Sequence, residues 1–197
     1  MEQKAKTMST FAHLPFEVTA AAEKPAQMGL VTLETDLTIE TEMRHFLSGA
    51  PGHNDASGVA LLHTRIACDD QVTAENLSLM EGRFADALAL FPKDYTFEVI
   101  GYGCTSASLV IGEARVQQII QSNADVAHVT TPLTAAKRGL AALNVARIGY
   151  LAPYISEISH QMCDEFGAAG FAVSAAATFG EGRDSVVGCI TPGSILQ

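Results

Sequence analysis

Residues 102–108 read Tyr-Gly-Cys-Thr-Ser-Ala-Ser, and this stretch decides the fold. It follows an apolar run at Phe97–Gly101 and precedes a predicted helix at Leu109–Ser122. A strand, a tight glycine turn and a helix in this order form the basic unit of a parallel α/β sheet. The order places Cys104 just before a helix N-terminus, where backbone N–H groups and the helix dipole favour the reactive thiolate.

Two hydroxyl side chains, Thr105 and Ser106, directly follow this cysteine. The N–H groups at the same turn are suited to hold a substrate carboxylate. Cys104 is therefore a candidate nucleophile or base. The alternative is a small, inert cysteine buried at a crowded strand end, which is common for free cysteines.

Apolar and helical segments alternate on both sides of this turn. We expect strands at Met28–Leu33, Val59–Ile66, Val126–Val129, Val145–Leu151 and Phe171–Ala175, and helices at Ile39–Leu47, Leu77–Leu90, Ala135–Leu143 and Glu157–Phe166. This alternation indicates parallel βαβ units and hence an α/β fold.

The two halves of the chain resemble each other at an offset of about 120 residues, which indicates two similar lobes; chance similarity of βα units is the alternative. Gly29-Leu30-Val31 and Gly149-Tyr150-Leu151 each precede a polar loop and a helix. The counterpart of Cys104 would then fall near roughly position 222, beyond Gln197. We expect an N-terminal tail at 1–27, a first lobe with a linking segment at 28–143, and a partial second lobe at 144–197.

Composition excludes several classes of function. With 12 basic and 22 acidic residues the net charge is −10, which argues against binding to nucleic acid. No apolar run is long enough to span a membrane. Four widely spaced cysteines without a CxxC pair argue against a metal site, and without a secretion signal we expect free thiols in a reducing cytoplasm. Beside Cys104 these are Cys68, Cys163 and Cys189, all expected to be structural or buried.

The stretch Tyr102–Glu113 (YGCTSASLVIGE) resembles the Asp/Glu racemase superfamily, in the branch of maleate cis–trans isomerases and arylmalonate decarboxylases. Met28–Met43, Thr131–Leu143 and Ile148–Met162 carry the same resemblance, which extends over residues 28–197. The sequences of these stretches are most similar to those of the racemase-like proteins of ectoine-utilisation operons. The resemblance implies two Rossmann-like (flavodoxin-like) lobes with parallel sheets related by pseudo-symmetry, an active site in the cleft, no cofactor and assembly as a homo-oligomer.

The resemblance also assigns roles to single residues. Cys104 matches the first-lobe cysteine of racemases and maleate isomerases, a position that is glycine in the decarboxylases. Thr105 and Ser106 match residues that bind a substrate carboxylate, and Tyr154 matches a tyrosine that hydrogen-bonds the carboxylate or enolate. Asp36 stands where maleate isomerases carry a substrate-binding asparagine, and an aspartate there would repel a dicarboxylate.

The sequence therefore predicts a cytoplasmic, cofactor-independent isomerase or racemase of a small carboxylic acid, similar to maleate isomerase, with no nucleic-acid or membrane partner. Two alternatives stay open. The first is a catalytically incomplete, binding-only chain, because the family's second cysteine is not found; the second is an enzyme similar to arylmalonate decarboxylase. Asp36 is also explained as a helix cap alone. His63 and His128 lie in apolar strand contexts and are expected in the core, although His63 is near a strand end where α/β sites gather.

Overall fold

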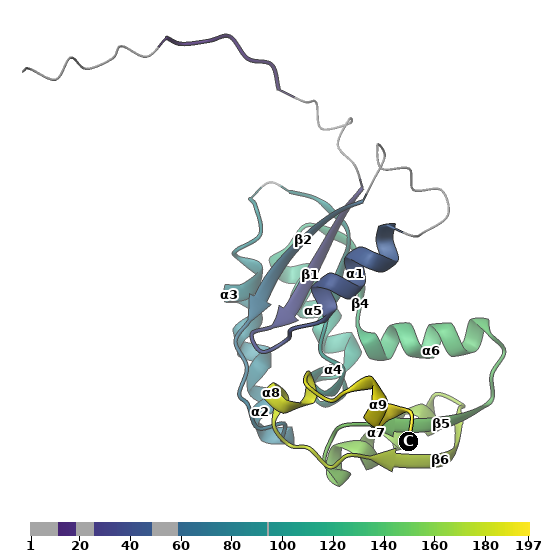
Figure 1. Cartoon of the computed structure of the whole chain (residues 1–197). Coiled ribbons are helices and arrows are strands. Elements are labelled where there is room, and N and C mark those ends of the chain that lie inside the picture. Colours follow the sequence, from purple (N-terminus) through teal and green to yellow (C-terminus); the bar gives the residue numbers. More distant parts are fainter. Residues whose placement is uncertain (1–11, 19–25, 49–58, 94) are drawn as a thin grey trace, which may run out of the picture.

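The computed structural model describes residues 12–18, 26–48, 59–93 and 95–197 of the chain (Figure 1). Most of the tail expected at 1–27 lies outside these residues, and its described part, 12–18, is exposed and contains no helix or strand. No helix in the described ranges is long and apolar enough to cross a membrane.

A four-stranded parallel sheet forms the larger part of the fold. Its strands are β1 (Gln27–Leu33), β2 (Ala60–Ile66), β3 (Phe97–Tyr102) and β4 (Val126–Thr130), in the order β2-β1-β3-β4. The predicted strands are confirmed to within two residues, because each is a short apolar run between turn residues. The two central strands end side by side, so the residues that follow β1 and β3 lie at one edge of the sheet.

The helices around this sheet are α1 (Ile39–Ser48), α2 (Ala74–Leu79), the 3₁₀ helix η2 (Met80–Arg83), α3 (Phe84–Leu88), α4 (Thr105–Ile111), α5 (Glu113–Asn123) and α6 (Pro132–Ala142). Two helix predictions were wrong in detail. The single helix expected at Leu77–Leu90 is three short pieces. The helix expected at Leu109–Ser122 begins earlier, at Thr105, and breaks at Gly112, whose φ of 89° no right-handed helix allows.

A second parallel sheet pairs β5 (Arg147–Ala152) with β6 (Ala172–Thr178). Its helices are α7 (Ser156–Ala168), α8 (Asp184–Val187) and α9 (Pro192–Ile195). The parallel α/β class predicted from the sequence is thus confirmed. The pseudo-symmetry of the lobes and the boundaries at 27/28 and 143/144 stay predictions.

An aromatic core holds the first sheet against α2, α3 and α5. Phe84 and Tyr102 are buried and meet edge to face, with ring centroids 4.7 Å apart. Phe91 and Phe97 pack at 4.8 Å. Because Tyr102 is the last residue of β3, this packing sets the position of the turn that carries Cys104.

The segment after β6 returns to the first sheet and joins the two parts of the molecule. The amide of Val72 donates to the carbonyl of Gly182 at 2.7 Å, and the amide of Asp184 donates to the carbonyl of Asp70 at 2.7 Å. Asp70 Oδ1 also accepts from the amide of Ser185 at 2.9 Å. These bonds place α8 beside α2, next to the carboxyl ends of the first sheet (Figure 1).

Two glycine substitutions test the assigned helix break, and they should change the free energy of unfolding in opposite directions. Gly112→Ala should destabilise the protein by about 1–3 kcal/mol, because a side chain is strained at a φ of 89°. Gly139→Ala, within α6 where an added Cβ meets nothing within 4 Å, should stabilise it by about 0.5–1 kcal/mol. Urea unfolding of both variants measures the difference, and equal effects would contradict the assigned break at Gly112.

Candidate functional site

Cys104 is the N-cap of α4, at the carboxyl end of β3. Its Sγ accepts a hydrogen bond from the amide of Ala107 at 3.4 Å and lies 3.6 Å from Ser106 Oγ. Only 4% of the residue is exposed. The turn predicted from the sequence therefore places the thiol at a helix N-terminus, as expected.

Gly103 allows this turn to approach the neighbouring segments closely. Its amide donates to the carbonyl of Val31 at 2.8 Å. A Cβ on Gly103 would lie 2.8 Å from Ile39 Cδ1, at the start of α1. A larger residue would thus require the Ile39 side chain to move.

A cavity of about 330 Å³ opens beside the thiol. Four segments line it: the end of β1 with the loop that leads to α1, the start of α4, the loop between β5 and α7, and the segment around α8. All five residues that the sequence singled out lie on its wall, namely Asp36, Cys104, Thr105, Ser106 and Tyr154. The fold thus gathers side chains from widely separated positions around one cavity; their roles stay predictions.

The thiol is more strongly affected by burial than by the helix N-terminus. Burial raises the pKa of Cys104, while the Ala107 amide and the Ser106 hydroxyl lower it in part, and the nearby Asp184 carboxylate raises it again. The donors of the turn favour the thiolate, as expected, but burial outweighs them, so that the pKa of Cys104 is raised in total. The sequence showed the local donors, but not the loss of water around the sulfur.

Tyr154 enters the cavity from the loop between β5 and α7. Its backbone carbonyl accepts bonds from the hydroxyls of Ser159, at 3.2 Å, and Thr178, which hold the loop against α7 and β6. Burial raises the pKa of the Tyr154 phenol, the adjacent Cys104 raises it further, and a hydrogen bond with Thr105 lowers it in part. The phenol therefore keeps its proton near neutral pH and is available as a hydrogen-bond donor.

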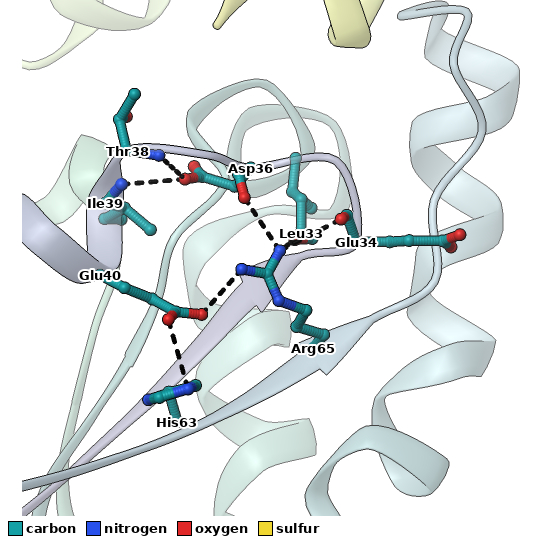
Figure 2. Close-up of polar contacts among 8 residues, drawn as sticks. All are labelled: Leu33, Glu34, Asp36, Thr38, Ile39, Glu40, His63 and Arg65. Atoms are coloured by element: carbon teal, nitrogen blue, oxygen red, sulfur yellow. Dashed lines mark hydrogen bonds and ion pairs between the residues drawn. The ribbon is translucent and has the colours of Figure 1, made fainter.

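Asp36 lies on the cavity wall and also caps α1. Its Oδ1 accepts hydrogen bonds from the amides of Thr38, at 2.8 Å, and Ile39, at 2.9 Å (Figure 2). These are the bonds of the helix-cap alternative. Asp36 thus has a structural role in addition to any contact with a ligand.

Asp184, the first residue of α8, is a cavity residue that the sequence reasoning missed. Thr35 Oγ1 donates to its Oδ2, across a separation of 149 residues in the chain. Burial raises the pKa of Asp184, the bond from Thr35 lowers it, and the nearby Asp36 and Asp70 raise it further. No local motif marks this residue, because only the return of the chain to the first sheet brings it here.

Several other expectations about single residues were wrong. His63 and His128 are exposed rather than in the core. His63 lies on the face of β2 opposite the buried Thr64 and Ile66, and no residue of β4 is buried. Cys189 is exposed rather than buried, and Cys163 is only partly buried. For Cys68 the structural role stays a prediction: it is partly buried, with its Sγ 3.3 Å from Thr35 Oγ1.

Known proteins provide three informative matches. A maleate isomerase of Nocardia farcinica is 29% identical over 173 residues, which make up 83% of this chain and 66% of that protein. The solved structure of a cysteine-to-serine mutant of the Nocardia farcinica maleate cis–trans isomerase, with a covalently bound succinylcysteine intermediate, superposes with a TM-score of 0.77. It is 26% identical and covers 88% of this chain and 71% of that one. Arylmalonate decarboxylase shares the fold, with a TM-score of 0.55 and 17% identity over 79% of this chain and 63% of that one.

The chain is thus similar to maleate isomerases in both sequence and fold. The resemblance predicted from Tyr102–Glu113 and the three supporting stretches is thereby confirmed. Its closeness to the ectoine-operon group stays a prediction. No protein-family model matches the chain. The chain spans just under two thirds of the length of the Nocardia farcinica relative.

The charge next to the thiol can be tested by alkylation. Near neutral pH, iodoacetamide should modify Cys104 more slowly than free cysteine, because burial raises the pKa of this thiol. Asp184→Asn should accelerate the reaction by roughly threefold or more, since removing the carboxylate lowers the pKa of Cys104. Mass spectrometry of the Cys104 peptide against pH measures both rates.

Asp125→Asn is the matched control for this substitution. Asp125 also accepts a hydrogen bond from a threonine hydroxyl, Thr96 Oγ1 at 2.7 Å, but it lies at the start of β4 and outside the cavity. Its alkylation profile should equal that of the wild type. An unchanged rate in Asp184→Asn would show that its carboxylate does not act on the thiol.

Proposed function

We propose that this protein is an isomerase of a small carboxylic acid and uses Cys104 as its nucleophile. The observation that carries the proposal is the position of the thiol: it lies at the wall of a cavity together with Thr105, Ser106 and Tyr154. A homologue of the same fold holds a covalently bound succinylcysteine intermediate, which supports sulfur–carbon bond formation in this group of proteins.

The reaction proceeds by addition and elimination. The Cys104 thiolate forms an S–C bond at one carbon of a cis double bond, and the electron pair of that bond moves toward the substrate carboxylate. The remaining C–C bond is then single and rotates. The electron pair returns, the S–C bond breaks, the trans double bond forms and the thiolate is released.

The polar groups around the thiol fit this sequence of steps. The Ala107 amide and the Ser106 hydroxyl contact the sulfur and stabilise its negative charge before addition and after release. The protonated phenol of Tyr154 and the hydroxyl of Thr105 are available as donors to the charge that develops on the carboxylate. The chemistry requires no cofactor, since the double bond and the thiol supply every electron.

The charge of the cavity bears on the substrate. Asp36 and Asp184 both line it, and no lysine, arginine or histidine does so among the described residues. Two nearby carboxylates repel a second negative charge on the ligand. We therefore expect an acid with less negative charge than the maleate dianion. Assembly as a homo-oligomer and residence in the cytoplasm remain part of the same proposal.

Proton NMR in D2O tests the proposal directly. The 197-residue chain is incubated with maleate, its monoamide, aspartate, glutamate, a hydantoin and an arylmalonate. Conversion of a cis to a trans acid without deuterium incorporation is the expected result. Deuterium at an α-carbon would indicate proton transfer in place of nucleophilic addition, and hence a racemase. Loss of CO2 would indicate a decarboxylase. No reaction with any of these acids would overturn the proposal.

A further inference from the structure

Arg65, near the carboxyl end of β2, makes an unusual set of contacts outside the cavity. Its Nη1 donates to three backbone carbonyls of the loop between β1 and α1: Leu33 at 2.9 Å, Glu34 at 3.1 Å and Asp36 at 2.9 Å. Its Nη2 contacts Glu40 Oε1 at 2.9 Å. Figure 2 shows the carbonyls of this loop turned toward the guanidinium.

The same strand holds the first turn of α1 from a second position. His63 precedes Arg65 by two residues, so the two side chains lie on one face of β2. His63 Nε2 lies 3.3 Å from Glu40 Oε2 (Figure 2). Glu40 is therefore held through both of its oxygens, and with it the start of the helix.

This loop is also a wall of the cavity. Its residues Thr35, Asp36, Leu37 and Thr38 line the space beside Cys104. On the cavity side, Thr35 bonds Asp184, and the Asp36 carboxylate caps α1. The backbone carbonyls on the other side bond Arg65. On the side away from the cavity, the backbone of the wall is thus held by one side chain.

The chemistry of arginine suits this role better than that of lysine. A guanidinium is planar and carries several donors in fixed directions, so it can bond several carbonyls at once. Arg65 is 44% exposed, and exposed ion pairs contribute little to global stability. Its main effect is therefore expected on the shape of the loop and not on the stability of the fold.

From these contacts we propose that Arg65 is a positioning residue, which holds the β1–α1 loop in the conformation that receives the substrate. The part of this proposal that concerns a substrate rests on the proposed function. The part that concerns the conformation of the loop does not. Arg65 acts through the backbone of the loop, including the carbonyl of Asp36, and does not itself line the cavity. The affinity of the cavity for any ligand should therefore depend on Arg65, a residue behind the cavity wall.

Hydrogen exchange provides a test that needs no turnover. The amides of Thr38 and Ile39 donate hydrogen bonds to the Asp36 carboxylate. In Arg65→Met these amides should exchange roughly tenfold faster, because the backbone of Asp36 is no longer held by the guanidinium. Cys104 should also be alkylated faster by iodoacetamide, since a loosened wall exposes the thiol. Arg65→Lys should restore only part of the protection, because an ammonium group cannot reproduce the planar fork.

Arg115→Met is the matched control. Arg115 has a similar exposure of 48% and also bonds a glutamate, Glu81, but it lies on α5 and outside the cavity. This variant should show wild-type exchange at Thr38 and Ile39 and wild-type alkylation of Cys104. Its melting temperature should change as little as that of Arg65→Met.

Turnover adds the readout that separates positioning from a merely structural role. With an acid that the wild type converts, Arg65→Met should raise KM by roughly tenfold and change kcat less, because the loop binds and does not react. Unchanged exchange at Thr38 and Ile39, or an unchanged KM, would overturn the proposal. If the wild type converts no acid, the proposed function fails, and the exchange and alkylation results alone decide on Arg65.

Discussion

Replacing Cys104 with alanine should reduce turnover by at least about 10³-fold while leaving the fold intact. The thiol is the nucleophilic group at the wall of the cavity, and the hydroxyls of Thr105, Ser106 and Tyr154 cannot form the S–C bond in its place. Stability should change little, because alanine fills most of the space of a cysteine. NMR measurement of the isomerisation rate, with circular dichroism as a check of folding, decides the point.

Cys189→Ala is the control for this substitution. Cys189 is an exposed free thiol whose Sγ lies 3.6 Å from the carbonyl of Ser185, and it does not line the cavity. Its loss should leave turnover unchanged. Wild-type activity in Cys104→Ala would show that Cys104 is not the nucleophile and would contradict the proposed addition step.

Phe84→Ala should destabilise the protein by about 3–5 kcal/mol, the largest effect on stability that we expect from a single residue. Phe84 is fully buried and packs edge to face against Tyr102, with ring centroids 4.7 Å apart. Removing the ring leaves a cavity between α3 and the end of β3, which the surrounding aromatic residues can fill only in part. Urea unfolding measures the loss.

Leu79→Ala, on the adjacent α2, provides the comparison. Leu79 is 54% exposed, and its truncation should change the free energy of unfolding by only about 0.5 kcal/mol. The contrast tests whether burial, and not helix location, determines the cost. A loss below about 1 kcal/mol in Phe84→Ala would show that this part of the core is loosely packed.

The strands and the reactive turn were predictable because their signals are local. Met28–Leu33 and Phe97–Gly101 are short apolar runs, and the strands found there are β1 and β3. The order of a strand, Gly103 and two hydroxyl residues was enough to place Cys104 at a helix N-terminus. These are properties of neighbouring residues, so they can be read from short stretches of the sequence.

The interruptions of the helices were not predictable to the same degree. Apolar spacing continues across Gly112 and across Met80–Arg83, yet the first site adopts a φ of 89° and the second narrows to a 3₁₀ helix. Periodicity reports which face is apolar, and it does not report whether the backbone stays regular. The helix that ends before Gly112, α4, packs against α2, α6 and α7, and periodicity along the chain does not contain these contacts.

Exposure of single residues depended on which parts of the sheet are covered. His63 and His128 have apolar neighbours in the sequence, but His63 lies on the face of β2 opposite the buried Thr64, and no residue of β4 is buried. In contrast, Cys104 follows a central strand and is buried. The order of strands is set by pairing between distant segments, and local composition does not contain it.

The sequence by itself determined the α/β class, the family resemblance and the turn that presents Cys104. Only the tertiary structure brought Asp184 to the cavity, placed Arg65 behind the loop of Asp36, and removed enough water from the thiol to raise the pKa of Cys104. The reason is physical. Hydrogen bonds and apolar periodicity along the chain act over a few residues, whereas desolvation and electrostatic contact depend on which distant segments are packed together.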